Sequence, residues 1–92
     1  MDGRKYPVGK NEITIGRYSS NVISYPEETP GVSRTHAKLY WDGRKLMLMD
    51  CNSSEGTYLK RMGMLQPMNP VEVNCGDIFY IGEKRNGFEI KR

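Results

Sequence analysis

The chain has 92 residues, 10 of them glycine, so it is long enough for one two-layer domain and too short for a second hydrophobic core. Its net charge of +3, with acidic and basic residues interspersed, suits an acidic ligand and excludes the densely basic surface of a nucleic-acid-binding tail. Two cysteines without a CxxC pair and a single histidine exclude a zinc cage and a disulfide framework, so we expect a reduced, cytoplasmic domain without metal or cofactor.

The first part of the chain alternates apolar and polar residues, which is the pattern of β-strands. Residues 12–15 predict a strand that buries Ile13 and Ile15, and residues 21–24 predict a second, short strand. Residues 25–32 contain two prolines and predict a loop.

A hairpin is predicted around Asp42-Gly43, a pair favoured in type I′ turns because both central residues need a positive φ. A two-residue turn there would pair Leu39 with Leu46 and Ala37 with Leu48. The residues then expected on the core face are Ala37, Leu39, Trp41, Leu46 and Leu48. The opposite, half-exposed face would carry Lys38, Tyr40 and Lys45.

Further strands are predicted at residues 56–59, 71–73, 77–81 and 88–90. Residues 60–70 predict a longer connection, and residues 85–87 predict a last hairpin turn. Many short strands separated by turns predict an all-β sandwich. We treat residues 1–92 as a single domain, which could stand alone or be cut from a longer chain.

Three short polar segments adjoin predicted strands and could meet at one end of such a sandwich: residues 16–17 (Gly-Arg), 33–36 (Ser-Arg-Thr-His) and 53–57 (Ser-Ser-Glu-Gly-Thr). Together they offer a guanidinium fork, hydroxyls and loop amides, which are the groups that bind a phosphate monoester. His36 has no acid or nucleophile at a useful spacing, and the chain has no cofactor motif, so we do not expect an enzyme.

These segments, in this order, resemble the motifs of the forkhead-associated (FHA) domain, a module that binds phosphothreonine peptides. The matching residues are 15–17 (Ile-Gly-Arg), 33–37 (Ser-Arg-Thr-His-Ala), 50–57 (Asp-Cys-Asn-Ser-Ser-Glu-Gly-Thr) and 76–78 (Gly-Asp-Ile). The resemblance covers nearly the whole chain. It implies an FHA/SMAD-like, two-sheet antiparallel β-sandwich of about ten or eleven short strands that binds phosphothreonine segments through loops at one end.

The resemblance also implies roles for individual residues. Arg17 would grip the phosphate, Ser33 would donate its hydroxyl to a phosphate oxygen, and Arg34 would reach the phosphate or the peptide backbone. The residues expected to contact the phosphopeptide are Arg17, Ser33, Arg34, Ser54 and Glu55. The residues expected to support the site, with His36 bracing the binding loop from within, are Gly16, His36, Ser53, Gly56 and Thr57.

Glu55 departs from the family pattern, which has Asn at this position. An ionised carboxylate only accepts hydrogen bonds, and at a surface-like dielectric two like charges about 8 Å apart repel by about 2 kcal/mol. Basic residues near it, such as Arg17, Arg34, Lys60 or Arg61, could offset part of this repulsion. Two interpretations stay open. Phosphothreonine binding could survive in weakened form, with a preference for Lys or Arg after the phosphothreonine, or the domain could bind protein partners independently of phosphate.

The implied partner is a phosphorylated protein, such as a Ser/Thr kinase or its substrate, bound in signalling. A small β-barrel that binds nucleic acid would need a basic stripe with interleaved aromatic residues, and the mixed charges of this chain argue against it. We therefore expect no nucleic acid as a partner. No stretch is long and apolar enough to span a bilayer, so we also expect no membrane contact by this domain.

Overall fold

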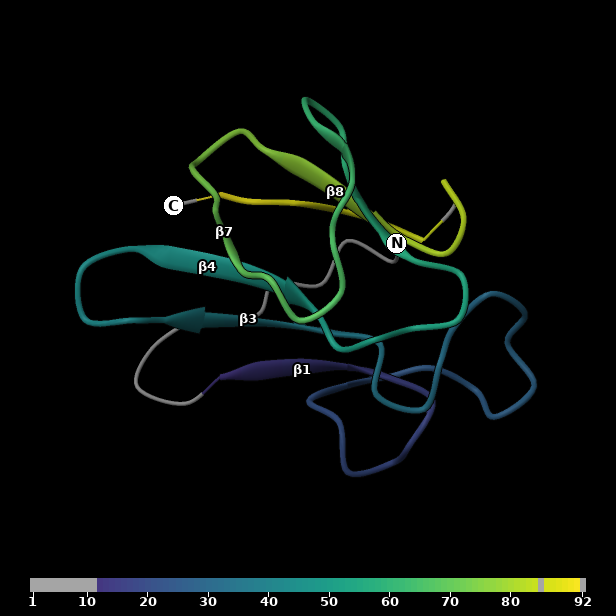
Figure 1. The fold of residues 1–92 in the computed structure, drawn as a ribbon. Coiled ribbons are helices and arrows are strands. Elements are labelled where there is room, and N and C mark those ends of the chain that lie inside the picture. Colours follow the sequence, from purple (N-terminus) through teal and green to yellow (C-terminus); the bar gives the residue numbers. More distant parts are fainter. Residues whose placement is uncertain (1–11, 85, 92) are drawn as a thin grey trace.

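The computed structural model describes residues 12–84 and 86–91. Within these ranges the chain forms nine strands and no helix, arranged as two layers (Figure 1). The strands are β1 (Ile13–Gly16), β2 (Ile23–Ser24), β3 (Ala37–Trp41), β4 (Leu46–Asp50), β5 (Thr57–Leu59), β6 (Gly63–Met64), β7 (Val71–Glu72), β8 (Ile78–Ile81) and β9 (Gly87–Glu89). The predicted all-β sandwich is thus confirmed, with nine strands in the described part against the ten or eleven expected for the whole chain.

One sheet has the strand order β2-β1-β3-β4-β7 and the other has the order β6-β5-β8-β9. Neighbouring strands are antiparallel except for β1 and β2, which run parallel. None of the described residues belongs to a helix able to cross a membrane.

The core lies between the two sheets and is built from the inward side of each. Ile15 and Leu48 from the first sheet and Leu59, Phe79 and Ile81 from the second are fully buried. Phe79 stacks on Phe88 of the neighbouring strand, with ring centroids 5.0 Å apart. Burial of each large apolar side chain contributes about 1.5–3 kcal/mol, so this layer holds the sheets together.

The β3–β4 turn lies one residue further along the chain than predicted. The Asp42 amide donates to the Lys45 carbonyl (3.0 Å), which makes Gly43 and Arg44 the central residues. Of these two central residues, only Gly43 has a positive φ, 103°. A type I′ turn needs a positive φ at both positions, whereas a type II′ turn needs it only at the first, which is the pattern seen here. The Asp42 carboxylate also accepts hydrogen bonds from the amides of Arg44 and Lys45, both at 2.8 Å, and these lower its pKa. This side-chain contact favours the observed turn over the predicted one.

The shifted turn changes every partner on β4 by two residues, so the predicted pairing was wrong. Leu39 pairs with Leu48, and Ala37 pairs with Asp50. Because side chains alternate with a period of two, the shift leaves Ala37, Leu39 and Leu48 on the core face as predicted. Trp41 is the exception: it is 55% exposed, because it lies at the end of the hairpin that projects past the second sheet (Figure 1).

Two other details of the C-terminal half differ from the predictions. The stretch 60–70, predicted as a connection, contains β6, which pairs with β5 through Tyr58 and Met64. Of the predicted turn at residues 85–87, position 85 lies outside the described residues and Gly87 already belongs to β9. The turn is closed instead by the Asn86 amide, which donates to the Glu83 carbonyl (3.0 Å).

Candidate functional site

Three loops meet at one end of the sandwich because the first sheet aligns the points at which they begin and end. Ile15 pairs with Ala37, and Ala37 pairs with Asp50. The end of β1, the start of β3 and the end of β4 therefore lie side by side. The loops that leave these points are residues 17–22, 25–36 and 51–56, and we call this region the loop end.

The first two loops touch through their backbones. The Arg17 amide donates to the Ser33 carbonyl and the Tyr18 amide donates to the Arg34 carbonyl, both at 3.1 Å. This approach requires glycine at position 16, because a Cβ there would lie 2.1 Å from the Arg34 carbonyl oxygen.

Asn21 joins the same contact, a role that the sequence reasoning missed. Its side-chain amide donates to the carbonyls of Arg34 (2.8 Å) and Tyr18 (2.9 Å), and the residue is buried. The alternation had placed Asn21 at the start of the predicted strand 21–24, and no local pattern signals that a side-chain amide will be buried to satisfy backbone groups.

His36 connects the second loop to the third. Its Nδ1 accepts a hydrogen bond from the Ser33 amide (3.0 Å), and its Nε2 lies 2.7 Å from the Gly56 carbonyl oxygen. A carbonyl can only accept, so the proton is on Nε2 and the imidazole is neutral. Burial lowers the pKa of His36, although the hydrogen bond to Gly56 opposes this in part.

The third loop is folded around the buried carboxylate of Asp50. This carboxylate accepts hydrogen bonds from the hydroxyls of Ser53 (2.5 Å) and Thr57 (2.7 Å) and from the Ser53 amide (3.0 Å). The Ser53 hydroxyl oxygen in turn accepts from the Gly56 amide (2.9 Å). Gly56 has a φ of 90°, a conformation that favours glycine, so the sharp turn before β5 depends on this residue.

The Ser33 hydroxyl lies where the second and third loops meet. Its oxygen accepts a hydrogen bond from the Ser54 amide (3.0 Å). Because this contact uses a lone pair of the oxygen, the hydroxyl proton stays available for a ligand.

Arg17 is held against the second loop by two backbone carbonyls. Its Nε donates to the Val32 carbonyl (2.5 Å) and one Nη donates to the Glu27 carbonyl (2.9 Å). No carboxylate in the described part of the chain forms an ion pair with it. The guanidinium is therefore fixed in position while its charge and its remaining N–H groups are free to meet an anion.

Arg17 lines a shallow depression of about 300 Å³, which we call the Arg17 depression. Its lining residues are Arg17, Thr29, Gly31, Val32, Ser33, Ser54 and Glu55. Four of the five residues predicted to contact a ligand thus come together here. The fifth, Arg34, is exposed, and its guanidinium lies over the Tyr18 ring, 5.6 Å from the ring centroid, rather than in the depression.

A second depression, of about 360 Å³, adjoins the first and was not foreseen. We call it the Tyr58 depression, and its lining residues are Asp50, Ser53, Ser54, Glu55, Gly56, Tyr58, Met64, Leu65 and Pro67. Ser54 and Glu55 line both depressions, so the two depressions meet at this pair of residues, which we call the wall. The Tyr58 hydroxyl donates to the Glu55 carbonyl (3.0 Å), which ties this wall to β5.

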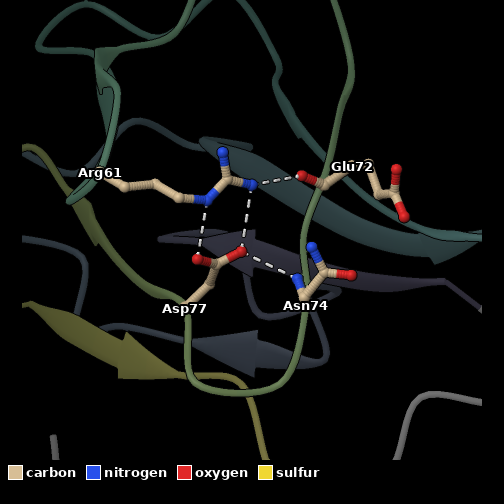
Figure 2. Close-up of polar contacts among 4 residues, drawn as sticks. All are labelled: Arg61, Glu72, Asn74 and Asp77. Atoms are coloured by element: carbon tan, nitrogen blue, oxygen red, sulfur yellow. Dashed lines mark hydrogen bonds and ion pairs between the residues drawn. The ribbon is translucent and has the colours of Figure 1, made fainter.

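Arg61, expected as a possible counter-charge for Glu55, is engaged at the opposite end of β5. Its guanidinium makes two hydrogen bonds to the Asp77 carboxylate (2.9 and 3.2 Å) and one to the Glu72 carbonyl (2.9 Å), as Figure 2 shows. The Asn74 amide donates to the same carboxylate (2.8 Å). These contacts raise the pKa of Arg61 and lower that of Asp77, and they leave Arg61 unavailable to Glu55.

The described residues contain no group of His, Cys, Asp or Glu side chains arranged to hold a metal ion. The two cysteines are free thiols: Cys51 is half-buried, which raises the pKa of its thiol, and Cys75 is exposed.

Comparison with known proteins points to one family. The family model of the FHA domain matches residues 13–82. The FHA domain-containing protein FhaA of Mycobacterium tuberculosis (strain ATCC 25618 / H37Rv) is 31% identical over 80 residues, which are 87% of this chain and 14% of FhaA. The chain thus spans about one seventh of the length of this relative.

Two solved structures have the same fold. One, described as a structural and functional analysis of phosphothreonine-dependent FHA domain interactions, has a TM-score of 0.72 and 31% identity, and the match covers 88% of this chain and 78% of that one. The other is the FhaA FHA domain complexed with the intracellular domain of Rv3910, with a TM-score of 0.72 and 31% identity over 88% of this chain and 82% of that one.

Proposed function

The chain belongs to the FHA domain family, and we propose that it binds a phosphothreonine-containing segment of a partner protein at the Arg17 depression. FHA domains are interaction modules rather than enzymes, so the role of the site is to hold a ligand. The whole protein to which such a domain belongs can carry other activities, since the relative FhaA is about seven times as long as the matched region.

One observation carries this proposal: a fixed guanidinium, paired with no carboxylate of residues 12–84 or 86–91, shares a depression with a hydroxyl whose proton is free. The carbonyls of Glu27 and Val32 orient Arg17, and the Ser54 amide orients the Ser33 hydroxyl. A phosphate monoester offers only acceptor oxygens and carries close to two negative charges at neutral pH, so it matches both donors. We assign direct contact to Arg17 and Ser33, with Ser54 and Glu55 at the wall.

The predicted supporting residues fit this assignment. His36 joins two of the loops, Gly16 permits the first two to touch, and the third loop is folded by Asp50 through Ser53 and Thr57. Donors held in place before the ligand arrives lose little conformational entropy on binding. We propose no contact for Arg34 with the phosphate itself, and its side chain is placed instead to meet residues outside the depression.

The proposed partner is a phosphorylated protein, a Ser/Thr kinase or a kinase substrate. The structure of the FhaA FHA domain complexed with the intracellular domain of Rv3910 supports a protein as the partner. The structure from the analysis of phosphothreonine-dependent FHA domain interactions supports phosphothreonine as the residue that is recognised. The free thiols Cys51 and Cys75 support a reducing, cytoplasmic location. Binding independent of phosphate, the second interpretation of Glu55, receives no support from these relatives.

The test is a titration of matched phosphothreonine and threonine peptides, selected from an oriented library, with the wild type and Arg17→Ala. We expect the wild type to bind only the phosphorylated peptide, and Arg17→Ala to lose at least about tenfold in affinity, because a hydrogen bond to a charged group contributes about 1.5–3 kcal/mol. Arg44→Ala removes the same charge from the β3–β4 turn, far from the loop end, and should bind normally.

A second variant distinguishes a loss of binding from a loss of the fold. Arg17→Lys keeps the charge but loses the fork, so it should bind with intermediate affinity if the domain is intact, which circular dichroism verifies. Equal binding of the threonine and phosphothreonine peptides, or an Arg17→Ala variant that binds like the wild type, would contradict the proposal.

A further inference from the structure

Glu55 is an acidic residue without a counter-charge at the wall between two depressions. Its side chain is exposed, and no cation in the described ranges lies within ion-pair distance of its carboxylate. Of the four basic residues that could have neutralised it, Arg17 binds backbone carbonyls, Arg34 lies over the Tyr18 ring and Arg61 pairs with Asp77. The fourth, Lys60, is exposed and forms no ion pair with Glu55. A carboxylate beside an anion site that pairs with no cation from the described part of its chain can receive one from a ligand.

The Tyr58 depression has the lining that a long cationic side chain needs. Tyr58, Met64, Leu65 and Pro67 supply apolar walls, and a Cβ at Gly56 would lie 3.0 Å from the Met64 sulfur, so the Met64 side chain lies over the Gly56 backbone. Lysine and arginine bury an apolar stem while the charged head stays near water or a counter-charge. Here the head would reach Glu55, and the Tyr58 ring could add a cation–π contact.

The other carboxylate in the lining, Asp50, cannot replace Glu55 as the partner of that head group. Asp50 is buried, with 1% of its surface exposed, and its oxygens already accept hydrogen bonds from Ser53 and Thr57. Its charge adds to the negative potential of the depression, but among the described residues that line it, Glu55 is the carboxylate that is exposed and accepts no hydrogen bond from another described residue.

Building on the proposed function, we infer that the Tyr58 depression is a subsite for a Lys or Arg of the bound segment, and that Glu55 determines this specificity. The phosphate and the basic residue would occupy neighbouring depressions on either side of the wall formed by Ser54 and Glu55. An extended peptide advances about 3.3–3.6 Å per residue, so a side chain one to three positions from the phosphothreonine can reach across.

The charge pattern also selects against other peptides. The Glu55 carboxylate repels the phosphate, and a Lys at the subsite offsets this repulsion, whereas a neutral residue leaves it in place and an acidic residue adds to it. The ligand class is therefore a phosphothreonine segment with a nearby basic residue, distinguished from one with nearby acidic residues.

The experiment places a single Lys in turn at each position within three residues of the phosphothreonine, in an otherwise neutral peptide. The same position carries Gln or Glu in the two reference peptides. Affinities are measured by fluorescence anisotropy for the wild type, Glu55→Gln and Glu89→Gln. Glu89 is exposed on β9, where it pairs with Ile78 and lines neither depression, so its variant makes the same charge change away from the site.

At one position we expect the wild type to prefer Lys over Gln by about twofold to fivefold, the range that exposed ion pairs reach, and to prefer Gln over Glu. Glu55→Gln should bind the Gln peptide more tightly than the wild type and should lose the preference for Lys. Glu89→Gln should keep it. Added salt should reduce the preference in the wild type.

The outcomes separate this inference from the proposed function. If phosphopeptides bind in an Arg17-dependent way but no position favours Lys, or if the preference persists in Glu55→Gln, the subsite is wrong while the proposed function stands. If no phosphothreonine peptide binds, both are overturned.

Discussion

At the scale of single residues, the loop end depends on side chains whose partners are backbone atoms. Arg17, Asn21 and His36 each bond to carbonyls or amides of a loop distant in sequence. Such contacts decide where the loops lie, and they also decide which donors are left over. Ser33 illustrates the second effect, because the amide of Ser54 uses its oxygen and leaves its proton free.

His36 gives a prediction on protonation. Its burial lowers its pKa, so the unfolded chain takes up a proton before the folded one as the pH falls. The stabilisation from the neutral ring is therefore complete above about pH 6.5 and is lost as the pH falls from there toward the lowered pKa. Because the chain has only one histidine, its ring nitrogens can be followed directly by NMR. We expect the Nε2–H tautomer to persist below pH 6.5; protonation at or above the ordinary pKa would contradict this.

At the scale of elements, the connections between strands are where the structure departs from simple patterns. The β3–β4 hairpin keeps its predicted faces but takes a different turn, because the Asp42 carboxylate accepts from the two amides that follow Gly43. The connection after β5 is likewise more ordered than its prolines suggest. Arg61, in the connection between β5 and β6, reaches Asp77, which directly precedes β8 of the same sheet, and the Glu72 carbonyl on β7 of the other sheet (Figure 2).

This cross-sheet contact predicts a stability effect that leaves binding unchanged. Arg61→Met should lower the midpoint of urea unfolding, because the bidentate contact to Asp77 and the bond to Glu72 are lost. Arg61→Lys should recover only part of the loss, since it restores the charge without the fork. Phosphopeptide affinity should not change, because the contact lies at the end of β5 opposite the loop end.

The same contact has a defined pH dependence. Hydrogen bonds from Arg61 and Asn74 lower the pKa of Asp77 in the folded state. Its stabilisation is therefore full above the ordinary aspartate pKa of about 3.9 and is lost as the pH falls through the lowered value. The difference between the unfolding midpoints of the wild type and Arg61→Met should narrow in that acidic range, to the part that comes from the Glu72 carbonyl. A constant difference down to the lowest pH would show that Asp77 is not the partner that matters.

At the scale of the whole molecule, binding and folding are linked because the loop end exists only in the folded sandwich. The loops are attached to strands of both sheets, and the core between the sheets holds those attachment points in place. A ligand that binds only this folded arrangement must stabilise it.

Phosphopeptide should therefore raise the thermal midpoint of the wild type. At a free concentration of about one hundred times Kd, the expected gain is about 2.7 kcal/mol in the free energy of unfolding. The unphosphorylated peptide should give no shift, and phosphopeptide at the same concentration should stabilise Arg17→Ala by no more than about 1.4 kcal/mol, the value for a tenfold loss of affinity. Differential scanning calorimetry measures the thermal midpoint of each protein with each peptide. A similar shift with both peptides would point to binding that ignores the phosphate.

The sequence by itself determined the periodic features of this protein. Alternation in residues 12–15 and 37–48 was enough to identify strands and, apart from Trp41, their buried faces, because side-chain direction repeats every two residues and tolerates the two-residue error in hairpin register. The order of the polar segments was also enough to indicate the family and the set of loops that meet.

Only the tertiary structure decided how those loops use their groups. Contacts such as Arg17 with Val32, or Ser54 with Ser33, join residues 15 and 21 positions apart, and no local pattern specifies them. The same holds for Arg34, which lies on Tyr18 instead of entering the depression, and for Glu55, which separates two depressions. The physical reason is that the sheet register sets the distances between loops, and these distances determine which donors and charges stay free for a ligand.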